Sequence, residues 1–164
     1  SQINEMAEKP LDVHLMITEP DRYLERFRDA GADLLTVHYE ACRDLHATLE
    51  EISGLGMKAS VSLKPGTEVS VLEPYLPKLD MVLIMTVEPG YGGQSFMEES
   101  FGRVQQLNEM IKEAGTHTVI EVDGGIGKDN LHDLKDAGAS VFVIGTSIFR
   151  AADPAAMIRE LKRL

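Results

Sequence analysis

Residues 119–126 read Val119-Ile120-Glu121-Val122-Asp123-Gly124-Gly125-Ile126. This short, largely apolar run ends in an acid, and two glycines follow it at once. It has the length of a buried parallel strand and the turn-rich exit that a strand needs before a helix begins. The same pattern recurs along the chain, and its repetition decides the fold.

Five further segments have this form, at Leu11–Ile17, Leu34–His38, Lys58–Leu63, Met81–Val87 and Val141–Ile144. Amphipathic stretches with helical spacing lie between them. Six βα units of this kind suit either an open doubly wound sheet or part of a (β/α)8 barrel. A closed eight-stranded barrel requires two more strands than these six.

The predicted helix boundaries support this alternation. Thr18 is expected to cap a helix that has Pro20 in its first turn and that ends at Gly31. Gly31 and Gly138 each stand between two alanines, where a helix is followed by a strand. Glycine supplies the left-handed residue of such a junction, and the alanines let helix and strand approach closely.

Composition limits the classes of partner. Sixteen basic and 27 acidic residues give a net charge of −11, and nucleic acids and anionic membranes both require a dense basic face. No apolar run approaches the length of a membrane span. Cys42 is the single cysteine, which allows no internal disulfide and fits a reducing, cytoplasmic compartment. We expect one domain over residues 1–164.

The first strand candidate carries polar residues on one face. Asp12, His14 and Met16 alternate with aliphatic residues, so the aliphatic face suits packing under helices and the other face would point into a barrel. His14 is then either a ligand or catalytic group, or a core histidine held by hydrogen bonds. From this motif alone the core histidine is the favoured interpretation, because an isolated histidine is weak evidence for a ligand.

Asp123 closes its strand at the end where catalytic groups of (β/α)8 barrels lie. The alternative is an ordinary turn or cap aspartate. However, Gly124 and Gly125 exceed what a cap requires, and they allow the backbone to approach a ligand closely. We therefore expect Asp123 to have a functional role.

A second glycine-rich segment, Glu88-Pro89-Gly90-Tyr91-Gly92-Gly93-Gln94, follows the fourth strand candidate. Its backbone N–H groups are free to surround phosphate oxygens. Gly145 and Thr146 end the last strand and open a helix, which is the usual place of a barrel's phosphate site. Together the two segments predict an anion pocket.

Other polar residues near strand ends have weaker patterns. We expect His38, with Glu40 close behind it, to be structural or to support a ligand residue. Lys64 would suit a Schiff-base lysine, although the Pro-Gly turn after it explains its place without chemistry. Met85 is expected to line the pocket, and Cys42 to play no part. Three further histidines are expected at the surface: His46, His117 and His132.

From about Pro10 to Leu164 the chain resembles the ribulose-phosphate 3-epimerases. Three segments occur in the order and spacing of that family, namely Leu11–Met16, Met85–Gln94 and Glu121–Ile126. Segments 37–41 and 64–67 also look like parts of it. The glycine-rich segment with its Val-Glu-Pro lead is the most specific of these motifs.

The resemblance implies a (β/α)8 TIM barrel, of which this chain would have strands three to eight. It implies interconversion of D-ribulose 5-phosphate and D-xylulose 5-phosphate in the pentose phosphate pathway, by proton transfer at C3 through an enediolate. A divalent metal ion is implied, with zinc first and iron, manganese or cobalt as alternatives. By residue match, His14 and Asp123 would bind the metal, and Asp123 would also be one of two acid–base groups.

The resemblance also implies a small sugar-phosphate substrate and a homo-oligomer. The residues expected to contact the substrate, chiefly its phosphate, are His14, Met16, Met85, Gly90, Tyr91, Gly92, Gly93, Gly124, Gly125, Gly145 and Thr146.

The sequence departs from the family pattern before Leu11. The family has two earlier strands, with a His-x-Asp segment that supplies the other metal histidine and the other acid–base aspartate. Residues 1–9 look instead like the end of the helix before the third strand. We therefore expect the 164-residue chain by itself to lack the first quarter of the barrel and to have little epimerase activity.

Three alternatives stay open at the level of sequence. The substrate could be a related ketose phosphate such as allulose 6-phosphate, although the motif before Gly90 leans away from it. Lys64 could serve a Schiff-base aldolase. The chain could also be a catalytically incomplete phosphate-binding or interaction module.

Overall fold

A computed structural model describes residues 2–164. Its centre is one sheet of six strands, paired in parallel and in chain order. The strands are β1 (Asp12–Leu15), β2 (Leu34–His38), β3 (Lys58–Leu63), β4 (Met81–Met85), β5 (Val119–Asp123) and β6 (Val141–Val143). A doubly wound sheet would reverse its strand order at a switch point, whereas this sheet does not. The predicted six βα units are confirmed.

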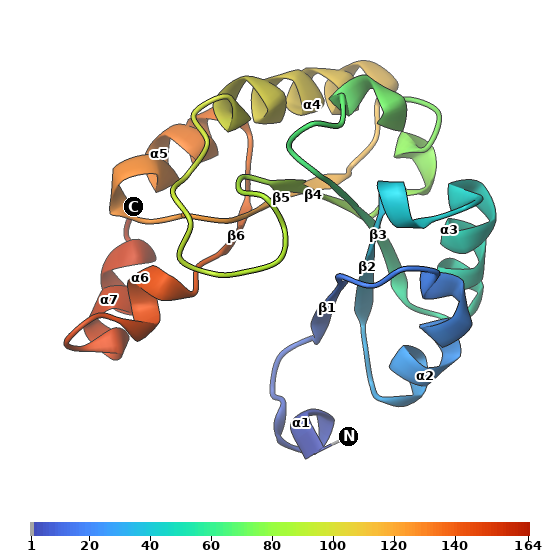
Figure 1. The fold of residues 1–164 in the computed structure, drawn as a ribbon, viewed down its shortest axis with the longest axis horizontal. Helices are drawn as coiled ribbons and strands as arrows, with labels where there is room; N and C mark the ends of the chain where they lie inside the picture. The colour runs from blue at the N-terminus through green and yellow to red at the C-terminus, as the bar shows by residue number, and fades with distance from the viewer. Residues whose placement is uncertain (1) are drawn as a thin grey trace.

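The sheet curls, and most of the helices lie on its outer side (Figure 1). The α-helices are α1 (Gln2–Met6), α2 (Leu24–Asp29), α3 (Leu45–Gly54), α4 (Ser100–Ala114), α5 (Lys128–Ala137), α6 (Thr146–Phe149) and α7 (Pro154–Leu161). Short 3-10 turns are η1 (Pro20–Tyr23), η2 (Tyr39–Ala41), η3 (Val69–Leu72) and η4 (Leu76–Lys78). Over residues 2–164, no helix is both long and apolar enough to cross a membrane.

The observed boundaries differ from the predicted ones at a few places. The first, fourth and sixth strands are shorter than predicted, because their last residues already turn toward the loops. Thr18 does not cap a helix; Glu19 lies before η1 in a left-handed conformation with φ 50°, and its side chain pairs with Arg22 and Arg43. The glycine prediction is confirmed, since Gly31 and Gly138 have φ values of 98° and 123°.

The two faces of the sheet have opposite character. Aliphatic residues of the outer face, such as Val37, Val61 and Ile84, are fully buried in the core under the helices. The inner face of β2 and β3 instead carries small or polar residues that are also buried. Four polar atoms there have no hydrogen-bond partner among the described residues: Thr36 Oγ1, His38 Nδ1, Ser60 Oγ and Ser62 Oγ. The inside of the curled sheet is therefore polar along β2 and β3, whereas β4 contributes the buried apolar side chains of Leu83 and Met85 there.

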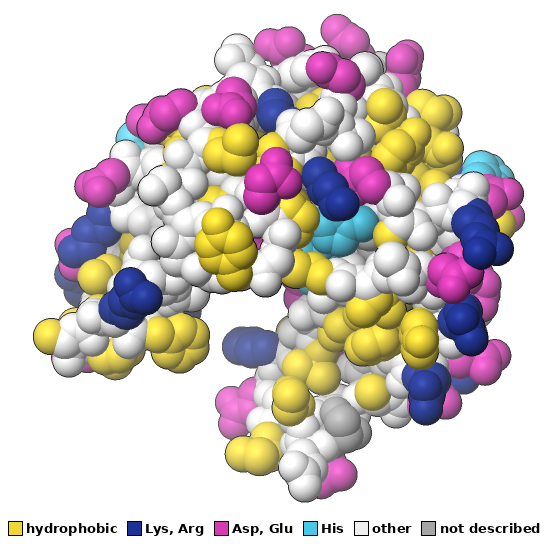
Figure 2. Space-filling model, viewed as in Figure 1, with side chains coloured by type: hydrophobic (Ala, Val, Ile, Leu, Met, Phe, Trp, Pro, Cys, Tyr) yellow, Lys and Arg dark blue, Asp and Glu magenta, His cyan; other side chains and the backbone are white. Residues whose placement is uncertain are grey.

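The curl leaves an opening between β1 and β6, which pair on one side only within the described residues. Figure 2 shows this opening as a deep notch between the α6–α7 region and the part that carries β1. Val143 and Phe149 are 41% and 83% exposed beside it. The structure therefore has the form of a half-barrel whose inside is open to solvent on one side.

Two acids from distant strands meet inside the sheet. Asp12 of β1 and Glu121 of β5 are hydrogen-bonded to each other. Burial, and then the negative charge of Asp12, raises the pKa of Glu121 to about 8. Burial also raises the pKa of Asp12, and the hydrogen bond with Glu121 lowers it in part. At neutral pH, Glu121 therefore carries the proton and donates to Asp12.

The acid pair makes stability depend on pH. Between its ordinary value of 4.5 and about 8, Glu121 keeps its proton in the folded state and loses it in the unfolded state. The stabilisation is thus complete below pH 4.5 and is lost as pH rises through 8. Glu121→Gln keeps a donor to Asp12 without this penalty. The melting temperature of this variant minus that of wild type should therefore increase between pH 5 and pH 9, by on the order of several degrees.

Thermal denaturation followed by circular dichroism measures this difference. Glu113→Gln, at an exposed position of α4, serves as the matched control and should follow the wild type at every pH. Parallel curves for Glu121→Gln and wild type would contradict the protonation of Glu121 in the folded state.

A candidate active site at the carboxyl ends of the strands

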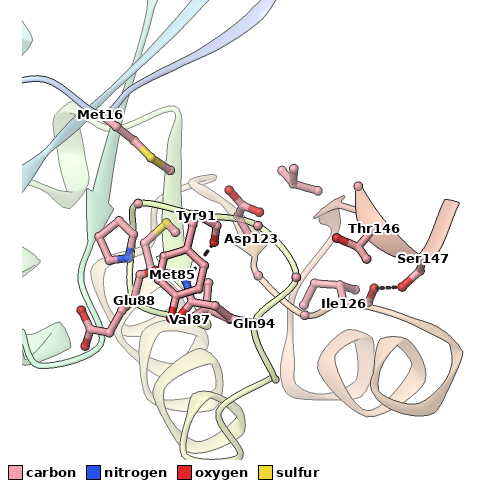
Figure 3. Close-up of a pocket in the computed structure, with 18 residues that line it drawn as sticks. Met16, Met85, Val87, Glu88, Tyr91, Gln94, Asp123, Ile126, Thr146 and Ser147 are labelled. Atoms are coloured by element: carbon pink, nitrogen blue, oxygen red, sulfur yellow. Dashed lines mark hydrogen bonds between the residues drawn. The ribbon is translucent and has the colours of Figure 1, made fainter. Parts of the chain in front are cut away.

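A cavity of about 470 Å³ lies at the carboxyl ends of β4, β5 and β6, next to the end of β1. This volume is within the range of small-molecule sites. Figure 3 shows its walls, with Met16 opposite the two loops that carry Asp123 and Thr146. It is lined by Met16, Met85, Val87, Glu88, Pro89, Gly90, Tyr91, Gly92, Gly93, Gln94, Asp123, Gly124, Gly125, Ile126, Val143, Gly145, Thr146 and Ser147. Every residue expected to contact substrate, apart from His14, is thus brought to one cavity.

His14 lies beside Asp123 rather than in the cavity wall. The distance from His14 Nδ1 to Asp123 Oδ2 is 4.0 Å, and the side chains are 17% and 26% exposed. Burial, helped by the neighbouring His38, lowers the pKa of His14 to about 4, so its ring is neutral at pH 7. Burial raises the pKa of Asp123. The curl of the sheet has therefore brought together two residues 109 positions apart in the sequence (14 and 123).

The ring of His38, in β2, contacts the ring of His14. The two Nε2 atoms are 2.8 Å apart, and the rings stack with their centroids 4.9 Å apart. On its other side, His38 Nδ1 lies 3.5 Å from Glu40 Oε2. The sequence indicated a supporting role for His38, but it gave no sign that His14 is the residue it contacts.

The glycine-rich loop after β4 is closed by one side chain. The Gln94 amide donates to the carbonyl oxygens of Glu88 and Tyr91, at 2.6 and 2.9 Å. Gly90 and Gly93 have φ values of 141° and 78°, which favour glycine over any residue with a side chain. The loop is therefore a shaped backbone structure whose form depends on its glycines and on Gln94.

Gly124 and Gly125 lie where the loops after β4 and β5 meet. A Cβ atom on Gly124 would be 2.4 Å from Val87 Cγ2, and one on Gly125 would be 2.6 Å from the backbone nitrogen of Phe96. Their φ values are also positive, at 125° and 65°. The two glycines are thus required for the loops to approach each other.

Side-chain hydroxyls join the three loops around the cavity. Thr86 Oγ1 donates to the carbonyl of Gly124, and Ser147 Oγ donates to the carbonyl of Ile126 at 2.8 Å. Sequence reasoning missed Thr86 and Ser147, as it missed Gln94. Their residue types are common in loops, and nothing in their spacing indicates which carbonyl they would reach.

Arg103 of α4 holds the outer side of the site. Its guanidinium donates to three backbone carbonyls, those of Met85 at 3.1 Å, Lys64 at 2.8 Å and Thr67 at 3.1 Å. Burial lowers its pKa, and the charges of nearby glutamates oppose that shift. Arg103 therefore fixes the exits of β3 and β4 relative to each other, which was not predicted.

Among residues 2–164, no lysine or arginine lines the cavity. Its charged members are Glu88 and Asp123, both acidic. An anion bound there would be held by backbone N–H groups and hydroxyls, as in other glycine-rich anion nests. Since α6 has only four residues, the groups at Gly145 and Thr146 would act on such an anion as local donors and not as the end of a long helix dipole.

His14 and Asp123 have the chemistry of metal ligands. A neutral imidazole and a carboxylate both bind divalent cations such as zinc, and tetrahedral coordination places two such ligand atoms ~3.4 Å apart. The distance of 4.0 Å between Nδ1 and Oδ2 is somewhat longer, so the two side chains would have to approach each other slightly to share one ion. Over residues 2–164, no three His, Cys, Asp or Glu side chains are grouped to hold a metal ion. The pair therefore fits part of a metal site, with further ligands required.

The remaining candidates lie away from this centre. Lys64 borders a neighbouring hollow that also contacts Met16, His38 and Glu40. Cys42 donates its thiol to the His38 carbonyl at 3.3 Å, and burial raises its pKa to about 11, which keeps the thiol protonated. The prediction of three surface histidines is confirmed for His46, His117 and His132.

Comparison with known proteins gives one consistent result. A family model described as the ribulose-phosphate 3 epimerase family matches residues 1–149. The ribulose-phosphate 3-epimerase of Bacillus subtilis (strain 168) is 43% identical over 161 residues, which cover 98% of this chain and 74% of the relative. That of Aquifex aeolicus (strain VF5) is 44% identical, covering 100% of this chain and 74% of the relative.

A solved structure supports the fold independently. The 3-hexulose-6-phosphate synthase of Salmonella typhimurium superposes with a TM-score of 0.69 at 23% identity, covering 99% of this chain and 75% of that one. At that identity the likeness concerns the fold alone. The parallel half-barrel, the cavity at its strand ends and the family match lead to one conclusion: the chain belongs to the ribulose-phosphate 3-epimerase family.

Proposed function

We propose that this chain acts as a ribulose-phosphate 3-epimerase, which interconverts D-ribulose 5-phosphate and D-xylulose 5-phosphate. The observation that carries the proposal is the position of Asp123, a carboxylate beside a neutral histidine at the edge of a cavity without cationic residues. Family membership supports the same reaction. In this proposal, the glycine-rich loops bind the phosphate, and the carbon chain of the sugar extends toward Asp123 and His14.

The backbone supplies the phosphate site. Gly90, Gly92 and Gly93 line one side of the cavity, and Gly145 and Thr146 line another. The hydrogen bonds of Gln94 and Ser147 hold these loops before any ligand arrives. A preformed nest reduces the ordering cost of binding and fixes the distance from the phosphate to the reacting carbon.

Asp123 is the proposed acid–base group on one face of the sugar. As a carboxylate it removes the C3 proton and becomes the carboxylic acid, and the electron pair left at C3 moves to the C2 carbonyl to give the enediolate. Inversion requires that a second group return a proton to C3 from the opposite face. Burial already raises the pKa of Asp123, which brings the carboxylate closer to the basicity that proton abstraction requires.

His14 and Asp123 are the residues that would hold a divalent metal ion, with zinc the first choice. Such an ion, when bound, would neutralise negative charge that develops on the substrate oxygens. Met16 and Met85 would form an apolar, polarizable wall near the reacting carbons, since both line the cavity. The homo-oligomer and the cytoplasmic location remain predictions from the sequence.

Asp123→Asn, made in the intact enzyme with the two earlier strands of the family pattern, tests the acid–base role. The amide keeps the shape of the side chain but cannot accept the C3 proton, so turnover should fall by about 10²–10⁴-fold. Solvent deuterium entering C3, followed by NMR, measures the loss, and affinity for inorganic phosphate should be unchanged. Lys64→Ala is the matched control: it keeps the backbone bonds of Lys64 and should retain activity. Near-normal turnover of Asp123→Asn would show that the acid–base assignment is wrong.

Gly125→Ala tests the phosphate site. The added Cβ would be 2.6 Å from the Phe96 backbone, at a φ of 65°, so the adjoining loop must move. We expect a raised KM for the sugar phosphate and a loss of stability of about 1–3 kcal/mol. Gly54→Ala, in α3 with open space around it, is the control and should leave KM unchanged. Steady-state kinetics and thermal melts decide; an unaltered KM in Gly125→Ala would contradict the assignment.

A further inference from the structure

Glu40, His38 and His14 form a line of side chains that leads from the loop after β2 into the half-barrel. The contacts along it are Glu40 Oε2 to His38 Nδ1 at 3.5 Å, and His38 Nε2 to His14 Nε2 at 2.8 Å. The free nitrogen of His14, Nδ1, then faces Asp123 at 4.0 Å. The line therefore ends at His14, which the proposed function assigns to a metal ion, on the side of the ring that faces Asp123.

The contact between the two rings admits one hydrogen atom only. At 2.8 Å, one Nε2 atom must donate and the other must accept, because two N–H groups would oppose each other. In a neutral imidazole, a proton on one nitrogen leaves a lone pair on the other. The choice of donor in this contact therefore determines which nitrogen of His14 has the lone pair.

The charge of Glu40 determines which histidine donates and which accepts in this contact. Burial opposes ionisation of Glu40, but the adjacent His38 ring and the hydrogen bonds from Thr67 and the Lys64 N–H lower its pKa to about 2, so it is an ionised acceptor. His38 Nδ1 is buried and has no acceptor nearer than this carboxylate among the described residues. A proton on Nδ1 faces the carboxylate favourably, whereas a lone pair there would be repelled by it.

The position of Glu40 is itself fixed by its other oxygen. Glu40 Oε1 accepts from the backbone N–H of Lys64 at 3.0 Å and from the hydroxyl of Thr67. Oε2 is left to face His38. Since this contact is 3.5 Å and the His14–Asp123 contact is 4.0 Å, the carboxylate of Glu40 has the stronger influence on the proton positions.

We propose that Glu40 and His38 are positioning residues that fix the tautomer of His14, with the proton on Nε2 and the lone pair on Nδ1 directed toward Asp123. His38 carries its proton on Nδ1 and accepts from His14. A histidine whose second nitrogen is hydrogen-bonded in this way is oriented as a ligand and is a better donor to a cation. The metal role rests on the proposed function, while the tautomer is a property of the protein alone.

NMR of the metal-free protein labelled with ¹⁵N-histidine, at pH 8, tests the tautomers directly. Imidazoles of ordinary pKa are neutral at that pH. The expected spectrum has a protonated Nε2 and a lone pair on Nδ1 for His14, and the reverse for His38. A His14 ring with its proton on Nδ1 would overturn the proposal. This measurement needs no variant and no bound metal.

Glu40→Gln should exchange the donor and the acceptor in the contact between His38 and His14. The Lys64 N–H and the Thr67 hydroxyl still require an acceptor, so the oxygen of the new amide takes the place of Oε1. The amide NH₂ then takes the place of Oε2 and donates to His38 Nδ1. His38 then carries its proton on Nε2 and donates to His14, whose own proton moves to Nδ1. An unchanged His14 tautomer in a folded Glu40→Gln protein would overturn the proposal.

Affinity for Zn²⁺, measured by competition with a chromophoric chelator, supplies a separate readout. Glu40→Gln should weaken binding by about 10–100-fold. Glu50→Gln, at an exposed glutamate of α3 that pairs with Lys78, is the matched control and should bind as the wild type does. Equal affinity of Glu40→Gln and wild type would contradict the positioning role.

The two proposals fail in different ways. If Zn²⁺ affinity is the same in wild type and His14→Ala while the NMR tautomers are as expected, the metal role of His14 is wrong and the tautomer assignment stands. If His14→Ala loses affinity but the wild-type tautomers are reversed, the metal role stands and the positioning role is wrong.

Discussion

The parallel register of the sheet is the constraint on which the site depends. Each strand pairs with the next in the chain, so residues of one face form rows, as with His14 beside Thr36 and Thr36 beside Ser60. A slip of one residue would turn the aliphatic face inward and the polar face toward the helices. The register also brings all strand ends to one rim. The cavity, its glycines and Asp123 lie together there because the strands end together.

The fold followed from the residues because its signals are local. Alternating aliphatic positions predicted the strands, and Gly31 and Gly138 predicted the helix-to-strand junctions. Thr18 failed as a cap because Glu19 adopts a left-handed conformation and pairs with arginines, one of them distant in sequence. Such a pairing has no signal in the segment that it alters.

The site was predictable only in its strand-end residues. Asp123 and the glycine-rich loops have recognisable positions relative to their own strands, so a single segment was enough to indicate them. The contact of His14 with His38 depends on the register of β1 against β2, which sets His14 beside Thr36 and so within reach of His38. Arg103 and Gln94 act on carbonyl groups, and every residue has a carbonyl. Backbone acceptors leave no trace in the sequence, which is why these supports required the structure.

The absence of lysine and arginine from the cavity wall also affects how a ligand arrives. A sugar phosphate approaching a chain of net charge −11 would be repelled at long range, and in the proposed phosphate site the dipoles of the loop N–H groups would attract it only at short range. Salt screens the long-range repulsion within about 10 Å at 0.1 M, and it affects the short contacts much less. Encounter therefore becomes faster, not slower, as ionic strength rises, which is the opposite of the behaviour of enzymes that draw phosphates in with a basic surface.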